Sequence, residues 1–136
     1  MLPVDAAGRV LLLHGWDPRH PDRPFWFTIG GAAEAGESLR DAGARELREE
    51  TGAIAQSWAL LSNWETSCTY GFSKSYYFHA TGVRQISKPT ADDLEGGEIL
   101  FLTRAEILAA LRDNSFLSLG HAAPLAFLLL DEISHA

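Results

Sequence analysis

The pattern of apolar and polar positions divides the start of the chain into two strands joined by a loop. Arg9–Gly15, "RVLLLHG", is a nearly continuous apolar run and predicts a buried strand. Trp16–Pro24 holds three prolines among charged residues, which predicts a surface loop. Phe25–Gly31, "FWFTIGG", predicts a second, short strand that ends in a pair of glycines.

The next segment has the end signals of a helix. Ser38 is a good N-cap residue, and Asp41, three residues later, occupies a position resembling that of a capping box. Gly52 follows the last helical residues and suits the left-handed conformation in which many helices end. We therefore expect a helix between Ser38 and Gly52.

Strands and helices alternate in the second half of the chain as well. The pattern predicts strands over Ala55–Thr69, Ser73–Gly82 and Glu98–Thr103, an acidic loop over Ile86–Gly97, a helix capped by Thr103 that ends near Arg112, and a last helix over Ala122–Ile133. Interleaved elements of this kind predict one α/β or α+β domain over residues 1–136.

Composition narrows the functional classes. The formal net charge is -7, which argues against a surface that grips a nucleic-acid polymer through its phosphates. Cys68 is the single cysteine, so an intramolecular disulfide is excluded. The longest apolar run near the end, Leu125–Leu130, is far shorter than the roughly 20 residues of a membrane span, and the first residues do not resemble a signal peptide. We therefore expect a cytoplasmic protein without a membrane partner.

Three carboxylates crowd one face of the predicted helix. At about 100° per residue, Glu46, Glu49 and Glu50 fall within an arc of about 100°. Glu46 and Glu50 repel each other at i, i+4, and all three lie near the helix end where the macrodipole disfavours anions. Two interpretations are open: a solvated acidic face, or a site for a hard cation such as magnesium or manganese.

The residues upstream favour the cation site. Gly31, five residues, Glu37, seven residues and then "RELREETGA" (residues 45–53) resemble the Nudix box, G-x5-E-x7-R-E-U-x-E-E-x-G-U, over residues 31–53. Two soft departures are Ala53 in the last aliphatic position and Ile29 where the family usually has proline before the glycine pair. Members of the family also have a full strand before the position of the Asp5–Gly8 turn, and we expect it to be an outer strand of the sheet. This chain has only the four residues "MLPV" there.

The resemblance implies a fold and a set of roles. The fold would be the Nudix fold, an α/β/α sandwich with a central mixed β-sheet and a loop–helix–loop box. Magnesium, or alternatively manganese, would be held by the carboxylates and by one backbone carbonyl, while Arg45 would orient a glutamate and Leu47 would anchor the helix in the core. The implied metal ligands are Glu46, Glu49, Glu50 and Gly31.

The same resemblance leaves the general base and the substrate contacts open. Glu49 is one candidate base, and Glu95 and Glu98, near the end of the acidic loop, are alternatives. Substrate contacts could come from Phe27 by stacking on a base, from Arg23 by meeting a phosphate, and from Tyr70. The five histidines have no metal-ligand spacing, and we assign them to surface or core positions.

The implied activity is hydrolysis of the pyrophosphate bond in a nucleoside diphosphate linked to another moiety. A nucleoside triphosphate or modified nucleotide is the first expected substrate, with ADP-ribose, nucleotide sugars and dinucleoside polyphosphates as alternatives. A hypothesis of a different class is a non-catalytic Nudix-fold module that binds nucleotides. The expected partner is thus a small molecule, and a homodimer is a possible assembly because dimers are common in the family.

Overall fold

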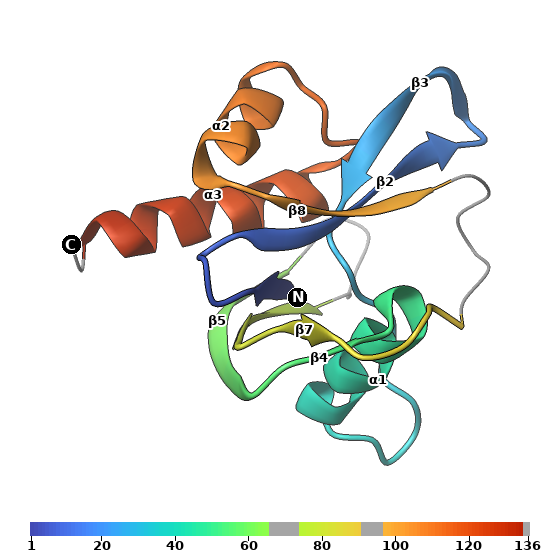
Figure 1. The fold of residues 1–136 in the computed structure, drawn as a ribbon, viewed down its shortest axis with the longest axis vertical. Coiled ribbons are helices and arrows are strands. Elements are labelled where there is room, and N and C mark those ends of the chain that lie inside the picture. Colours follow the sequence, from blue (N-terminus) through green and yellow to red (C-terminus); the bar gives the residue numbers. More distant parts are fainter. Residues whose placement is uncertain (66–73, 91–96, 135–136) are drawn as a thin grey trace.

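The central sheet is organised around the long strand β2 (Val10–Asp17). In the computed structural model, which describes residues 1–65, 74–90 and 97–134, β2 pairs with β8 (Glu98–Leu102) along one edge (Figure 1). Its other edge pairs first with β1 (Leu2–Val4) and then with β3 (His20–Phe27). β6 (Lys74–Thr81) and β5 (Ser57–Glu65) extend the sheet beyond β1.

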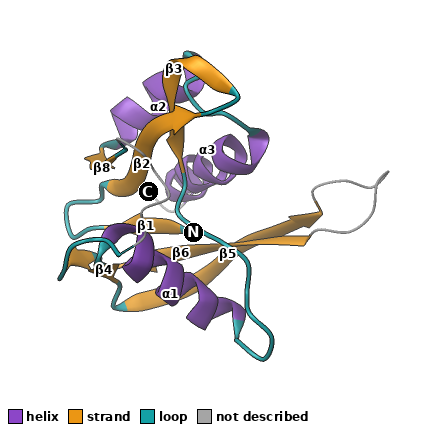
Figure 2. Cartoon of the chain, turned by 90° about the vertical axis from the view of Figure 1, so that its right-hand side faces the viewer, coloured by secondary structure: helices purple, strands orange, loops and turns teal. Residues whose placement is uncertain are grey.

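The sheet is mixed and covered on both faces. β1 and β6 run parallel, whereas the other pairs of this sheet are antiparallel. Helix α1 (Leu39–Thr51) lies on one face, and α2 (Arg104–Arg112) and α3 (Leu119–Ser134) lie on the other (Figure 2). The prediction of an α/β/α sandwich with a mixed sheet is therefore confirmed.

Alternate side chains along β2 pack into two hydrophobic cores on opposite faces of the sheet. Val10 and Leu12 pack in a cluster that includes Ile107 of α2 and Leu125 of α3. Leu11 and Leu13 point to the opposite face and pack in a cluster with Leu47 of α1. A strand buried on both faces has no polar side to show, which explains the continuous apolar run in the sequence.

Helix α1 forms with the predicted ends. The Ser38 hydroxyl accepts a hydrogen bond from Asp41 N at 3.1 Å, and Gly52, with φ 68°, donates its N–H to the Arg48 carbonyl at 2.8 Å. Leu47 is fully buried, which confirms that it anchors the helix in the core.

A short strap crosses the end of this helix. After β4 (Ala53–Ile54) pairs with β7 (Arg84–Gln85), residues 86–90, here called the strap, return over the C-terminal turn. The N–H groups of Ile86 and Ser87 donate to the Gly52 carbonyl at 2.9 and 3.1 Å, and Thr90 N donates to the Glu49 carbonyl at 2.8 Å. The strap thus satisfies carbonyls that a helix end leaves without partners.

Several predicted elements differ from those observed. The strand predicted over Ala55–Thr69 is β5, from Ser57 to Glu65, and residues 66–69 lie outside the described residues. The loop predicted over Trp16–Pro24 is wrong, because β2 continues to Asp17 and β3 starts at His20. β3 lies at the end of the strand order, and an edge strand tolerates Pro21 and Pro24 since it need not donate every N–H. The last helix begins at Leu119 rather than Ala122, with the Ser118 carbonyl accepting from its first turn.

The N-terminal strand also corrects an expectation. β1 was expected as an outer strand, but it lies inside the sheet between β2 and β6, and Leu2 and Pro3 are fully buried. Three residues are enough because each is paired with β6, from Leu2 opposite His79 to Val4 opposite Thr81. Of the helices in the described ranges, none has the length and apolarity to cross a membrane.

Candidate active site

Arg45 is the hub of the acidic cluster on α1. Its guanidinium donates to both carboxylate oxygens of Glu37, with N–O distances of 3.1 and 3.2 Å, and to Glu46 at 2.8 Å and Glu49 at 3.1 Å. It also donates to the Ala32 carbonyl at 3.1 Å. One side chain therefore joins the loop before α1 to two carboxylates on the helix.

The electrostatics of this cluster favour the charged forms of Arg45 and Glu37. The hydrogen bonds to Glu37 and Glu46 raise the pKa of Arg45 above its ordinary value. The hydrogen bond from Arg45 lowers the pKa of the Glu37 carboxyl, and a backbone contact at Glu34 acts in the same direction. Glu37 therefore stays ionised at neutral pH and fixes the loop, since it also accepts from Glu34 N at 3.0 Å.

Gly31 lies directly against the Glu46 carboxylate. A Cβ atom added at residue 31 would overlap the carboxylate atoms of Glu46, so any other residue there would have to displace that carboxylate from its present position. Glu50 turns toward the same loop, with the neighbouring Gly30 N–H donating to its carboxylate at 3.4 Å. The structure thus brings Gly31, Arg45, Glu46, Glu49 and Glu50 to one end of α1.

The remaining predicted site residues lie elsewhere or outside the described residues. Glu98 is exposed at the first position of β8, opposite His14 of β2. Glu95 and Tyr70 lie outside the described residues. Phe27, at the end of β3, makes an edge contact with the His121 ring at a centroid distance of 5.4 Å.

Arg23 belongs to a separate surface. Its guanidinium donates to the Asn114 carbonyl at 2.9 Å and covers the Phe25 ring at 4.7 Å. It lines a cavity of about 420 Å³ formed by β3 and the segment between α2 and α3. The structure does not bring Arg23 into contact with the box residues that it describes.

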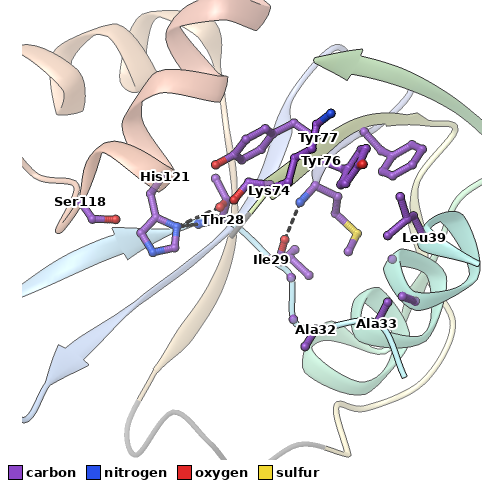
Figure 3. A pocket seen from close by; sticks show the side chains of 18 residues that line it. Thr28, Ile29, Ala32, Ala33, Leu39, Lys74, Tyr76, Tyr77, Ser118 and His121 are labelled. Carbon is purple, nitrogen blue, oxygen red and sulfur yellow. Dashed lines mark hydrogen bonds between the residues drawn. The ribbon is translucent and has the colours of Figure 1, made fainter. Parts of the chain in front are cut away.

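A larger cavity of about 540 Å³ opens beside the loop between β3 and α1, residues 28–38, here called the box loop (Figure 3). Figure 3 shows Lys74, Tyr76 and Tyr77 of β6 on one side and Ala32 and Ala33 of the box loop on another. His121 and Ser118 lie together at one end, around the start of α3. Gly30 and Gly31 also line this cavity, which connects it to the acidic cluster.

Sequence reasoning missed the polar residues at the far end of this cavity. Thr28 N and Oγ1 lie 3.2 and 2.9 Å from His121 Nδ1, although the two residues are 93 positions apart. His121 carries no local motif, and only the packing of α3 against the sheet places it there. Lys74 of β6 lines this cavity, whereas Arg23, which was expected to meet a phosphate, lines the other one.

A comparison with protein families identifies the domain that carries this sheet and acidic cluster. A model described as the NUDIX domain matches residues 1–119, which include the whole box and all strands of the central sheet. The chain belongs to the Nudix family.

Curated relatives resemble parts of this Nudix protein. It is 28% identical to an ADP-ribose pyrophosphatase from Mycobacterium tuberculosis over 91 residues, which are 67% of this chain and 44% of that protein. It is 50% identical to an m7GpppN-mRNA hydrolase from Xenopus laevis over 44 residues, 31% of this chain and 15% of that protein. The Nudix chain thus spans less than half the length of each of these relatives.

Solved structures support the same fold. A crystal structure of an ADP compounds hydrolase has a TM-score of 0.83 at 20% identity and covers 99% of this chain and 71% of that one. A MutT protein from Bacillus halodurans has a TM-score of 0.66 at 23% identity, covering 94% of this chain and 78% of that one. At these identities the likeness shows the Nudix fold.

The chemistry of the box residues suits a hard divalent cation. The carboxylates of Glu37, Glu46 and Glu49 share the one guanidinium of Arg45, and carboxylate oxygens are the ligands that such cations prefer. As they stand, no three acidic, histidine or cysteine side chains among the described residues converge on one point. Glu49 is 46% exposed, so a cation in solvent can reach its carboxylate while Arg45 holds it.

Proposed function

We propose that this Nudix protein is a magnesium-dependent hydrolase that cleaves the pyrophosphate bond of a nucleoside diphosphate linked to another moiety, with manganese as the alternative metal. The supporting observation is the position of the box. Gly30 and Gly31 contact the box carboxylates and also line the cavity of about 540 Å³. Cavities of about 300–1,000 Å³ hold small ligands, so a nucleoside could occupy this one while its phosphates meet the box.

Each box residue has a role in this proposal. Glu46, Glu49, Glu50 and the Gly31 carbonyl would hold the metal, which when bound would offset phosphate charge and activate water. Arg45 would keep Glu46 and Glu49 in place through its hydrogen bonds. The oxygen of water would attack one phosphorus as the bond to the bridging oxygen breaks, and a carboxylate would take the proton of water.

Glu49 is the first candidate for the base that takes this proton. Its side chain is 46% exposed at the helix face that carries the other carboxylates, so it can meet solvent. Glu98 and Glu95 remain the alternatives.

An ADP-linked compound such as ADP-ribose is the first substrate to test. It is favoured because the relative aligned over 67% of this chain is an ADP-ribose pyrophosphatase. A nucleoside triphosphate or modified nucleotide is the second candidate, and nucleotide sugars and dinucleoside polyphosphates complete the panel. The acidic cluster is common to all of these reactions, so the choice among them depends on the cavity.

The decisive experiment compares wild type with Glu50→Gln on this panel in the presence of magnesium. Because Gln keeps an acceptor for the Gly30 N–H but loses the charge, we expect kcat/KM to fall by at least about 100-fold on the preferred substrate. Asp113→Asn is the matched control. Asp113 is the C-cap residue of α2, a different helix, and its side chain makes no ion pair with any described residue.

The outcomes separate the two classes of function. Undiminished turnover by Glu50→Gln would show that this residue is not part of the metal site. If wild type turns over no member of the panel while magnesium and nucleotides still raise its Tm, the chain is a nucleotide-binding module and the proposed hydrolase activity is wrong.

A further inference from the structure

His121 is held in one tautomer by its contact with Thr28. The backbone N–H of Thr28 points at Nδ1 with an N–N distance of 3.2 Å, and a backbone N–H can only donate. Nδ1 must therefore be the acceptor and carry no hydrogen. The Thr28 hydroxyl, 2.9 Å from the same nitrogen, adds a second contact (Figure 3).

The second ring nitrogen is left as a donor. In a neutral imidazole with an unprotonated Nδ1, the hydrogen is on Nε2. Burial lowers the pKa of His121, so the ring is neutral at pH 7. Nε2 has no hydrogen-bond partner among the residues that the structure describes, and His121 lines the cavity of about 540 Å³.

The rest of the cavity has the complementary chemistry for a nucleoside. Tyr76 and Phe78 present aromatic surface from β6, and the described lining includes Lys74 but no carboxylate. His121 and Ser118 supply polar groups at one end, while Gly31 and Ala32 lie at the box. A ligand that spans the cavity would thus place an acceptor atom near His121 and its phosphates near Glu46.

We infer that His121 is a specificity-determining residue that donates a hydrogen bond from Nε2 to an acceptor atom of the nucleoside part of the ligand. Thr28 is its positioning residue, because it fixes the tautomer. This inference rests on the proposed function for the identity of the ligand, but it concerns binding and not the hydrolytic step. A donor fixed in this way rejects a ligand that lacks the matching acceptor, since a buried polar group would then stay unpaired.

The test uses AMP, GMP, CMP and UMP as probes with magnesium and the full chain. Long-range ¹⁵N–¹H NMR should show His121 with hydrogen on Nε2 and none on Nδ1, and at least one mononucleotide should shift the Nε2 signal. His121→Ala should weaken the Kd of that mononucleotide about 5- to 10-fold, the loss expected for one hydrogen bond. His121→Gln, which can place an amide N–H near the same point, should recover part of the affinity.

His20→Ala is the matched control, because His20 is exposed on β3 and lines the other cavity. Thermal melts establish that each variant is folded. An Nδ1–H tautomer, a Nε2 signal that no mononucleotide shifts, or an unchanged Kd in His121→Ala would each overturn the inference.

The two proposals can fail separately. If the panel shows no turnover but a mononucleotide shifts Nε2 and His121→Ala weakens its binding, the binding role stands and the hydrolase proposal falls. If wild type hydrolyses a panel substrate and His121→Ala leaves its KM unchanged, the hydrolase proposal stands and the role of His121 falls.

Discussion

A single guanidinium organises the box at the scale of one residue. Arg45 is 26% exposed and contacts Glu37 and Ala32 in the loop as well as Glu46 and Glu49 on the helix. The like charges at this helix end would otherwise repel one another, and the shared cation offsets part of that repulsion. Arg45 therefore both stabilises the acidic cluster and orients two of its carboxylates.

We expect Arg45→Lys to lower kcat/KM about 10- to 100-fold, the range measured when outer partners of metal ligands are changed. A lysine has one ammonium group and cannot reproduce the planar fork that reaches Glu37, Glu46 and Ala32 together. Arg40→Lys is the control on the same helix, because the one ion pair of Arg40 with a described residue is the exposed contact with Asp41 at 3.3 Å. Steady-state kinetics with circular dichroism would check this, and wild-type kinetics in Arg45→Lys would contradict the positioning role.

At the scale of elements, a feature could be predicted from the sequence when the residues that specify it lie close together along the chain. The ends of α1 are marked by Ser38 and Gly52, and the carboxylates that contact Arg45 lie within eight residues of it. The cavity could not be predicted in this way, because β6, the box loop and the start of α3 meet only in the folded chain. The strand predicted at Phe25–Gly31 covers only the end of β3, and its first part, residues 20–24, was missed because prolines resemble a loop unless the strand is known to lie at an edge.

The strap gives a prediction about the end of α1. Gly52→Ala should destabilise the protein by roughly 2–4 kcal/mol, because φ is 68° and the added Cβ would overlap the Ser87 carbonyl. Gly8→Ala is the control, since Gly8 has φ 75° but open space around a Cβ, so only the backbone cost of about 1–2 kcal/mol should appear.

Urea unfolding of both variants measures the difference. If the two substitutions lower the free energy of unfolding equally, the strap can move away from residue 52 and does not fix the end of α1.

At the scale of the whole molecule, the acidity of the chain is unevenly distributed. The net charge is -7, yet the described lining of the larger cavity contains Lys74 and no carboxylate, while the box beside it concentrates them. A ligand with a negative diphosphate would be repelled by the box without a cation and accepted by the cavity next to it. This division explains how an acidic protein could bind an anionic nucleotide: the cation would meet the phosphates, and the cavity would hold the rest.

Acid should destabilise the folded chain through carboxylates that are paired in it. Hydrogen bonds from Arg19 lower the pKa of Asp17 to about 2, and those from Arg45 lower the pKa of Glu37. A carboxyl whose pKa is lowered in the folded state takes up a proton more readily when the chain is unfolded. The stability that it contributes is therefore present above its unfolded pKa, near 4, and is lost as the pH falls through its folded pKa. We expect the free energy of unfolding to decrease from about pH 4 to pH 2, with net proton uptake on unfolding. Urea titrations across this range would measure it. Asp17→Asn should reduce the uptake by up to about one proton, and a slope equal to that of wild type would mean that the Asp17–Arg19 pair does not persist in solution.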